Sequence, residues 1–449
     1  MRSIREMCVE RSFLGNPSFV LLAMLGVFAG SSGVYACSAD DATATSAAQD
    51  TTTVAERAEA ARAMAVWNTV ALRTTAAAPF SPPQETRSMA IVSAAVFDAV
   101  NAIDSKYEPF VARVAATRDA SRSAAIAAAA RRALVSLYPS ASAAIQTDYD
   151  AELARIAEGS SKSAGIAVGL AAADSVLAAR ANDHAAERVT YVPQSAAGMW
   201  APTPPAFAAA LEANWGKVTP FVMSSGSQFR PAPPPAMGSA EYQRDLQEIA
   251  AIGLAGSLTR TSAQTEAARF WMSTAPQLWN QVVRQLTVAR NLEPAATARV
   301  YLLFNAAGAD AMIAAWEAKY TYQQWRPIAA IRRGAADGSL TSPIDTTWAP
   351  LIATPPFPDY PAGHTTYAGA AEAVLKSLLG ERPGEFTITS ATAGGATHRY
   401  TSFAEVCDEV VNARVWGGVH WRTSSAAGLE LGSKIGTLAL GRAVLKASR

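Results

Sequence analysis

The chain has 449 residues, of which 50% are hydrophobic and 17% charged, and its 38 basic and 37 acidic side chains leave a formal net charge of +1. A net charge this close to zero gives no electrostatic basis for binding nucleic acid or an anionic membrane surface. Any functional role of the basic residues must therefore come from a few of them converging locally. The chain is long enough to bury a sizeable core.

The N-terminus is typical of an export signal. Three arginines and two glutamates precede an apolar run from Phe19 to Ala29, whose 11 residues suit a signal peptide and are few for a bilayer span. Val34-Tyr35-Ala36 is an acceptable cleavage site. Residues 1–36 are therefore predicted to be a signal peptide, and the mature protein to be periplasmic or extracellular. A buried N-terminal helix is the alternative.

The cysteines provide no disulfide framework. Cys8 lies in the predicted signal, which leaves Cys37 and Cys407. Cys37 resembles the attachment cysteine of a bacterial lipoprotein, although Tyr35 is atypical of that motif, so a lipid anchor stays open as the one expected membrane contact. Cys407 has acidic neighbours, which disfavour a thiolate and indicate a structural residue. No Cys/His spacing suits structural zinc.

Helical periodicity dominates the chain after a small, polar tether at residues 37–56. Alanine-rich faces favour helix formation and close helix packing. The pattern predicts helices over Val54–Leu72, Thr86–Ile103, Asp119–Leu137, Ala141–Ala181 (as one helix or two), Ala240–Leu254, Ser262–Met272, Pro276–Arg290, Pro294–Tyr322, Thr365–Leu379, Phe403–Val415 and Ser425–Ala443.

Other segments do not read as helix. Prolines predict surface loops at Pro202–Pro205 and Pro231–Pro235. A loop-rich stretch runs from Arg332 to Pro361, and only Glu385–Ser390 reads as a strand.

The predicted fold is therefore all-α. A single all-helical domain is expected over residues 57–446, with two halves at about 57–200 and 240–446 that are joined by the proline-rich loops.

The first candidate site segment contains Lys319 and Arg326, two helical turns apart and so on nearly the same helix face. Pro327 disfavours helix at Arg326 and places it at or beyond a helix end. Lysine supplies a point charge, and arginine adds a planar fork that holds two anion oxygens. Taken alone, the pair also fits a solvated charged face.

The second segment is Pro361-Ala362-Gly363-His364, which opens a helical run. Amides at a helix N-terminus bind anions through free N–H groups and the helix dipole. A histidine there can donate a proton to a leaving oxygen. A simple helix cap is the alternative.

The third segment places Arg414 and His420 on either side of Gly417-Gly418, a pair that indicates a helix break and close backbone approach. Together, the three segments predict a site for phosphate or a phosphate-shaped ion such as vanadate. One histidine would attack or ligate, and the other would move protons. Two histidines lie outside these segments: His398 is expected to be a satisfied loop residue or to approach the pocket, and His184 to be exposed.

In their order, the three segments resemble the motif set of the type 2 phosphatidic acid phosphatase superfamily, which is Lys-x6-Arg-Pro, Pro-Ser-Gly-His and Arg-x5-His. This superfamily includes acid phosphatases and vanadium haloperoxidases. Further segments resemble the haloperoxidase branch, and the likeness covers most of residues 60–440. These segments are Met89–Asp104 with Tyr107, Thr265–Met272, FPDYPAGHTTYAGAAEAVL and GGVHWR. The resemblance implies an all-helical fold of two bundles, with the anion site in the second.

The resemblance also implies roles for individual residues. His420 would be the metal ligand to vanadium, and His364 the acid–base residue that handles peroxide protons. The remaining contacts to the cofactor would come from Lys319, Arg326, Arg414 and the Gly363 amide. In a phosphatase, His420 would instead form a phosphohistidine, and His364 would protonate the leaving alcohol.

Two positions depart from the family pattern. Ala362 replaces the serine of the second segment and removes a hydroxyl donor. Ser424 stands where an aspartate often follows the third-segment histidine, so no acid at that position orients His420. The second loss counts against a phosphatase, and either change is compatible with a weakened site.

The sequence therefore predicts an exported vanadate-dependent haloperoxidase that acts on hydrogen peroxide, a halide and a small organic acceptor. The alternatives are an acid phosphatase acting on a phosphate ester and a catalytically weak phosphate-binding protein on the same scaffold. The identity of the halide, the organic acceptor and the oligomeric state stay open.

Overall fold

The computed structural model describes residues 53–78, 81–333 and 345–441. The predicted signal peptide, Cys37 and most of the predicted tether lie outside these residues. The described residues all belong to one compact unit.

The described residues are mostly helical, which confirms the predicted fold class. Two strands, β1 (Phe386–Ser390) and β2 (Ala396–Tyr400), pair antiparallel. The α-helices are α1 Val54–Ala77, α2 Pro82–Asp104, α3 Arg122–Leu137, α4 Ser142–Leu153, α5 Ser160–Ala179, α6 Ala240–Ile252, α7 Ser262–Phe270, α8 Ala275–Arg290, α9 Pro294–Tyr322, α10 Pro327–Arg333, α11 Gly363–Leu379, α12 Phe403–Trp416 and α13 Arg422–Gly441.

Two expectations about secondary structure were wrong. The hairpin has a second strand, β2, where one strand alone was predicted. Arg332 and Arg333 were predicted to begin a loop, but they form the end of the short helix α10. The stretch Ala141–Ala181 forms two helices, as one of the two predicted arrangements has it.

The start of each long helix follows from its sequence. Thr53 and Ser81 cap α1 and α2 through reciprocal bonds with Glu56 and Gln84 three residues on, and Pro82 opens α2. These capping boxes satisfy backbone N–H groups that a helix leaves free at its first turn. Helix α1 starts at the predicted residue, Val54, and α2 starts at Pro82, before the predicted Thr86.

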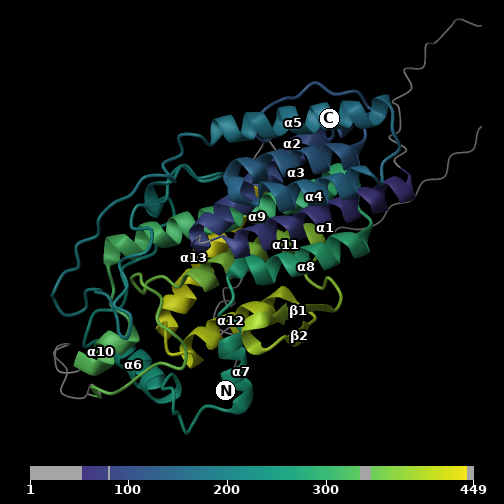
Figure 1. The fold of residues 1–449 in the computed structure, drawn as a ribbon. Helices are drawn as coiled ribbons and strands as arrows, with labels where there is room; N and C mark the ends of the chain where they lie inside the picture. Colours follow the sequence, from purple (N-terminus) through teal and green to yellow (C-terminus); the bar gives the residue numbers. More distant parts are fainter. Residues whose placement is uncertain (1–52, 79–80, 334–344, 442–449) are drawn as a thin grey trace, which may run out of the picture. The chain divides into compact units, whose positions relative to one another are not determined.

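Most of the helices pack around one main core, and a second, smaller cluster joins α6 and α10 to Trp325, Val415 and Trp421 beside the candidate site. The buried residues of the main core come from both predicted halves of the chain, and α2 packs extensively on α9. Figure 1 shows α2, α3 and α5 side by side, with the β1–β2 hairpin beside α12. The helix α5 is long and apolar enough to cross a bilayer, a property it shares with many core helices of soluble proteins.

Buried carboxylates hold two loops onto the central helices. Asp98 of α2 accepts hydrogen bonds from the amides of residues 110–112, at 2.6 to 3.2 Å. Asp310 of α9 accepts from the amides of residues 221–223, at 2.7 to 2.8 Å. Since a buried carboxylate needs several donors to compensate for lost water, each aspartate fixes the loop that supplies them.

Candidate active site

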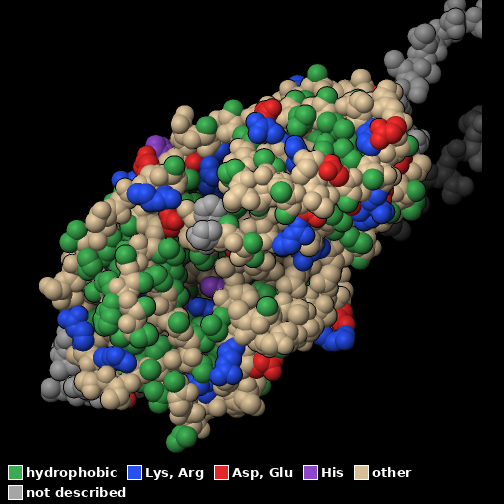
Figure 2. Space-filling view, in the orientation of Figure 1, with side chains coloured by type: hydrophobic (Ala, Val, Ile, Leu, Met, Phe, Trp, Pro, Cys, Tyr) green, Lys and Arg blue, Asp and Glu red, His purple; other side chains and the backbone are tan. Residues whose placement is uncertain are grey.

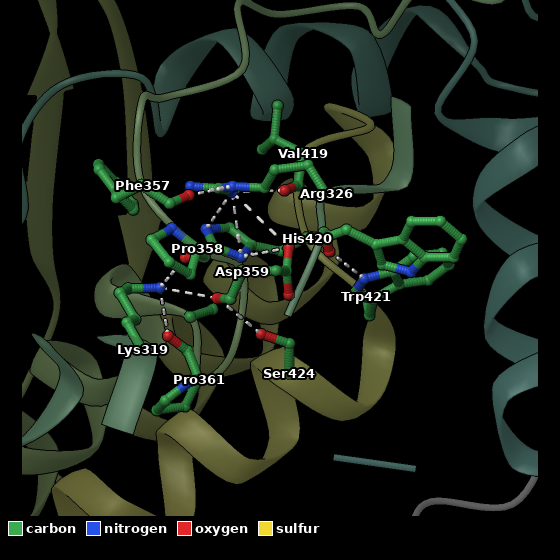
Figure 3. A network of polar contacts seen from close by, with 12 residues as sticks. Lys319, Arg326, Phe357, Pro358, Asp359, Pro361, Val419, His420, Trp421 and Ser424 are labelled. Atoms are coloured by element: carbon green, nitrogen blue, oxygen red, sulfur yellow. Dashed lines mark hydrogen bonds and ion pairs between the residues drawn. The ribbon is translucent and has the colours of Figure 1, made fainter. Parts of the chain in front are cut away.

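The three candidate segments meet at one buried place (Figure 3). The side chains of Lys319 and Arg326 are fully buried, and Arg414 and His420 are 2% and 1% exposed. They come from the end of α9, the turn before α10, the last turn of α12 and the turn before α13. Such a cluster of buried like charges is costly unless an anion accompanies it.

Arg326 reaches the cluster by a route that the sequence did not predict. Helix α9 ends at Tyr322, and Gln323 adopts a left-handed conformation with φ 51°. Arg326 therefore lies beyond the helix, as its neighbour Pro327 indicated, but the expectation of a shared helix face with Lys319 was wrong. Instead, Arg326 is held by carbonyls, with Nε donating to Phe357 at 2.8 Å and Nη1 to Val419 at 2.7 Å.

Lys319 is saturated by main-chain acceptors. Its Nζ donates to the carbonyls of Pro358, Asp359 and Pro361, at 3.0, 2.7 and 2.6 Å (Figure 3). Burial, followed by the charge of Arg326, lowers the pKa of Lys319. Three acceptors nevertheless match the three donors of an ammonium group. Lys319 therefore contributes charge and holds the loop, without a free N–H for a further ligand.

Within this cluster of cations, two buried donors have no partner among the described residues. They are Nη2 of Arg326 and Nε of Arg414, whose Nη1 donates to the Trp271 carbonyl at 2.6 Å. Leaving a buried donor unpaired costs about 1–3 kcal/mol, and more for a charged group. Both atoms are therefore placed to bind an acceptor such as an anion oxygen.

The N-terminus of α11 adds further donors. Ala362 is the N-cap, and no side chain caps this helix. Gly363 is its first residue, and a Cβ there would lie 3.3 Å from Cζ3 of Trp316, so the glycine allows close packing against α9. The uncapped amides and the helix dipole favour an anion at this end.

His364, the second residue of α11, is neutral at ordinary pH. Burial, followed by the charge of Arg414, lowers its pKa to about 3. Its Nε2 lies 3.1 Å from the Ser273 carbonyl. Because a carbonyl only accepts, Nε2 carries the proton, and Nδ1 is left with a lone pair that can take up a proton.

His420 is also neutral. Burial, followed by the charge of Arg326, lowers its pKa well below the usual value. Nη1 of Arg326 lies 3.4 Å from Nδ1 and 3.2 Å from Nε2 of the ring. A neutral imidazole keeps one unprotonated nitrogen, and this nitrogen can bond to a metal or attack phosphorus.

Asp359 is a site residue that the sequence analysis missed. Its Oδ1 lies 3.1 Å from Nδ1 of His420 and 3.7 Å from Nη1 of Arg326. The side chain is fully buried. Burial raises its pKa to about 6, against the opposing effect of Arg326 and Lys319. One feature of the sequence could have identified it: Asp359 is an acidic residue within FPDYPAGH, the segment that also contains His364.

The two departures from the family pattern lie next to each other. The Ala362 amide donates to the Ser424 carbonyl at 3.0 Å, and Ser424 Oγ donates to the Asp359 carbonyl at 3.2 Å. Ser424 is fully buried. The position where the family often has an acid therefore adjoins the loop that carries Asp359.

The remaining histidines and Cys407 lie apart from this cluster. His398, on β2, contacts Glu409 at 2.8 Å and Glu266 at 3.0 Å, so it is a satisfied residue, but on a strand and not on a loop. His184 is exposed, as predicted. Cys407 is buried.

Figure 2 shows that this face of the molecule is hollowed near its middle, where histidine and basic side chains are visible. Hydrophobic side chains gather beside the hollow.

Comparisons with known proteins agree with this geometry. Residues 299–447 match the family model described as the VCPO second helical-bundle domain. The vanadium chloroperoxidase of Curvularia inaequalis is 29% identical over 204 residues, which cover 38% of this chain. These matches show that the chain is similar to proteins of the vanadium haloperoxidase superfamily.

Solved structures of vanadium haloperoxidases extend the likeness over most of the chain. A bacterial vanadium-dependent iodoperoxidase superposes with a TM-score of 0.74 and 26% identity, over 86% of this chain and 97% of that one. A bacterial vanadium-dependent chloroperoxidase has a TM-score of 0.64 and 17% identity, over 81% and 92%, and supports the fold alone. The alignment with the Curvularia haloperoxidase spans 33% of that protein's length.

Proposed function

We propose that the protein is an exported vanadate-dependent haloperoxidase that oxidises a halide with hydrogen peroxide to hypohalous acid. The observation that carries this proposal is the pair of buried, unpartnered N–H donors of Arg326 and Arg414. They share a buried cluster with the neutral His420, near the uncapped start of α11.

The donor set fits a tetrahedral oxyanion. His420 would hold vanadium through a ring nitrogen, and Arg326, Arg414 and the Gly363 amide would donate hydrogen bonds to its oxygens. Lys319 contributes positive charge, because its own donors are occupied by carbonyls. Vanadate, when bound, supplies the Lewis acid that activates peroxide.

His364 suits the proton transfer that peroxide binding requires. Its Nε2–H is fixed on the Ser273 carbonyl, and its Nδ1 is free to accept a proton. The pKa of about 3 keeps this residue in the accepting form. We expect His364 to take up the peroxide proton once a bound oxyanion offsets the charge of Arg414, because a group with a pKa of about 3 is otherwise too weak a base.

An acid phosphatase is the second candidate, and one observation favours it. The absence of an acid at Ser424 argued against a nucleophilic histidine, but Asp359 lies 3.1 Å from the same ring. A histidine oriented by a carboxylate can act as a nucleophile on phosphorus. The third candidate, a phosphate-binding protein, would need the anion site but no catalytic histidine.

Paired assays on the purified mature protein distinguish these candidates. The protein is stripped of anions and then assayed with and without added vanadate, for peroxide-dependent bromination of a phenolic dye and for hydrolysis of an aryl phosphate. Chloride and iodide replace bromide in parallel reactions, and the His420→Ala variant is the control. Vanadate-dependent bromination supports the haloperoxidase, and phosphate hydrolysis without it supports the phosphatase. Phosphate binding with neither activity supports the binding protein.

Export is tested separately from catalysis. Cell fractionation locates the protein, and mass spectrometry of its first peptide defines the processing site. The proposal expects a mature chain that begins at Cys37, with or without lipid. A cytoplasmic chain that retains Met1–Ala36 would contradict export while leaving the enzyme assignment intact.

A further inference from the structure

His420 must present one particular ring nitrogen to the anion, and a neutral imidazole has two tautomers to choose from. The proton resides on the nitrogen that faces an acceptor. In the family pattern, an acid four residues after the histidine often provides this acceptor, but here the residue is Ser424. Its Oγ donates to the main chain of Asp359 and not to the ring.

The acceptor nearest to the ring comes from another segment. Asp359 Oδ1 lies 3.1 Å from Nδ1 of His420 (Figure 3). The two atoms form a close ion-pair contact. A neutral histidine that faces a carboxylate favours placing its one N–H there, which would put the proton on Nδ1 and leave the lone pair on Nε2.

The backbone of Asp359 is clamped on three sides. Its amide donates to the Gln324 carbonyl at 2.9 Å, and its carbonyl accepts from Lys319 Nζ at 2.7 Å and from Ser424 Oγ at 3.2 Å. The side chain is fully buried. A carboxylate held in this way is positioned by the fold, which a role in orienting another side chain requires.

We propose that Asp359 is the positioning residue for His420, and that it supplies from the loop before α11 the carboxylate that Ser424 lacks. Asp359 keeps the proton on Nδ1 and thereby leaves Nε2 for the anion. This inference rests on the proposed oxyanion site. The competing interpretation is that Asp359 only neutralises the cations and competes with an incoming anion.

The ring tautomer of the anion-free protein tests the proposal without any cofactor. Two-bond 1H–15N correlation spectra of the histidine rings distinguish the two tautomers, and the signals that vanish in His420→Ala assign the residue. The wild type is expected to show the Nδ1–H form. Asp359→Leu, which has similar volume and no unpaired buried charge, should fold and shift the ring to a mixture or to the Nε2–H form.

Moving the carboxylate provides a rescue. In the double variant Asp359→Ala/Ser424→Asp, an acid returns on the α13 side of the ring while the space at residue 359 is vacated. The Nδ1–H form should reappear. Asp98→Asn is the matched control, because it alters another buried aspartate, on α2, that only holds loop amides. Its His420 signals should equal those of the wild type.

Vanadate affinity is the second measurement. Removing the partner of a metal-binding histidine typically weakens binding about 10- to 100-fold. Asp359→Leu should show this loss, and the double variant should recover most of it. Unchanged tautomer and tighter binding in Asp359→Leu would overturn the proposal in favour of simple neutralisation. If the wild type binds no vanadate but its tautomer still depends on Asp359, the positioning role stands and the haloperoxidase assignment fails.

Discussion

At the scale of single residues, the site is defined by buried charge. Burial lowers the pKa of Arg326 to about 10 and that of Arg414 to about 9, so both side chains stay protonated at neutral pH. Among the described residues, Asp359 is the one carboxylate in contact with this cluster. Three cations against one carboxylate leave an excess of positive charge that a bound oxyanion would balance.

Replacing His420 by alanine is expected to abolish vanadate binding and peroxidase activity while the helical circular dichroism stays unchanged. In the proposed site, His420 would bond the metal, and the other described contacts would be charge and hydrogen bonds. Metal analysis after vanadate loading and gel filtration measures this. Stoichiometric vanadium retained by the variant would contradict the ligand assignment.

Ala362→Ser is expected to tighten vanadate binding about ten- to a hundredfold, because a hydroxyl donor to a charged acceptor contributes about 1.5–3 kcal/mol. Ala362 is the N-cap of α11, so the same hydroxyl can accept from a helix amide and stabilise the fold by about 0.5–2 kcal/mol. Vanadate titration of the anion-free protein measures the first effect and thermal unfolding the second. Raised stability without tighter binding would mean that the hydroxyl caps the helix and does not face the anion.

At the scale of elements, glycines let α11 and α13 approach so closely that the anion site can form between their starts. A Cβ on Gly432 would overlap the carbonyl oxygen of Thr366, and one on Gly369 would overlap that of Leu429. Backbone atoms cannot yield as a flexible side chain does. The position of the α11 N-terminus therefore depends on this contact.

Gly432→Ala is expected to destabilise the protein by roughly 1–3 kcal/mol or more, through overpacking against α11. Gly441→Ala is the matched control on the same helix, because a Cβ there meets nothing within 4 Å. Urea unfolding of both variants measures the difference. Equal stability of the two variants would contradict the packing argument.

A second element contact, between β2, α12 and α7, is expected to depend on pH. The hydrogen bond to Glu409 is the main cause that raises the pKa of His398 above its ordinary value of 6.5, and Glu266 adds to it. The hydroxyl of Tyr400 also faces this group. A histidine whose folded-state pKa is raised contributes stability below its unfolded pKa and loses it as the pH rises through the folded value.

The His398→Gln variant should therefore lose stability relative to the wild type at about pH 6, and the loss should shrink as the pH rises above the folded pKa. Urea unfolding of both proteins across this range measures the effect. A difference that is independent of pH would show that packing against Phe270, which stacks on the ring at 4.0 Å, matters more than charge.

Local rules explain which elements were predictable. The long helices follow from apolar periodicity, and α9 matches its predicted bounds because Pro294 opens it and the chain turns at Gln323. The helix α10 was missed because it has too few residues for a periodic pattern of apolar residues. The strand β2 was missed because its residues are mostly polar and it pairs with β1 through its backbone. Asp359 was missed because its role depends on a contact with a ring that is 61 residues away in sequence.

At the scale of the whole molecule, the main core holds helices from both predicted halves, and the proposed oxyanion site lies between this core, through α9 and α11, and the smaller cluster of α6 and α10. A ligand that binds only the folded protein stabilises it by mass action, by about 2.7 kcal/mol at a hundred times its dissociation constant. Because the described residues belong to one compact unit, this gain is expected to appear in a single cooperative transition.

Vanadate and phosphate should therefore both raise the unfolding temperature of the anion-free protein, and phosphate should slow the recovery of peroxidase activity by vanadate. Both ions need the charges of Lys319, Arg326 and Arg414. Thermal unfolding with each ion, and reconstitution against millimolar phosphate, measure this. Reconstitution that ignores phosphate would show that the two ions do not share a site.

Hydrogen bonds to its carbonyl oxygens hold the loop Phe357–Pro361 in place. Arg326 donates to the carbonyl of Phe357, and Lys319 donates to three carbonyls further along the loop. Carbonyls are the same in every amino acid, so the path of this loop does not depend on which side chain residue 359 carries. That position can therefore change its chemistry without rebuilding the pocket. For evolution or for an engineer, it is a place to adjust the charge beside His420 while the rest of the catalytic scaffold is left as it is.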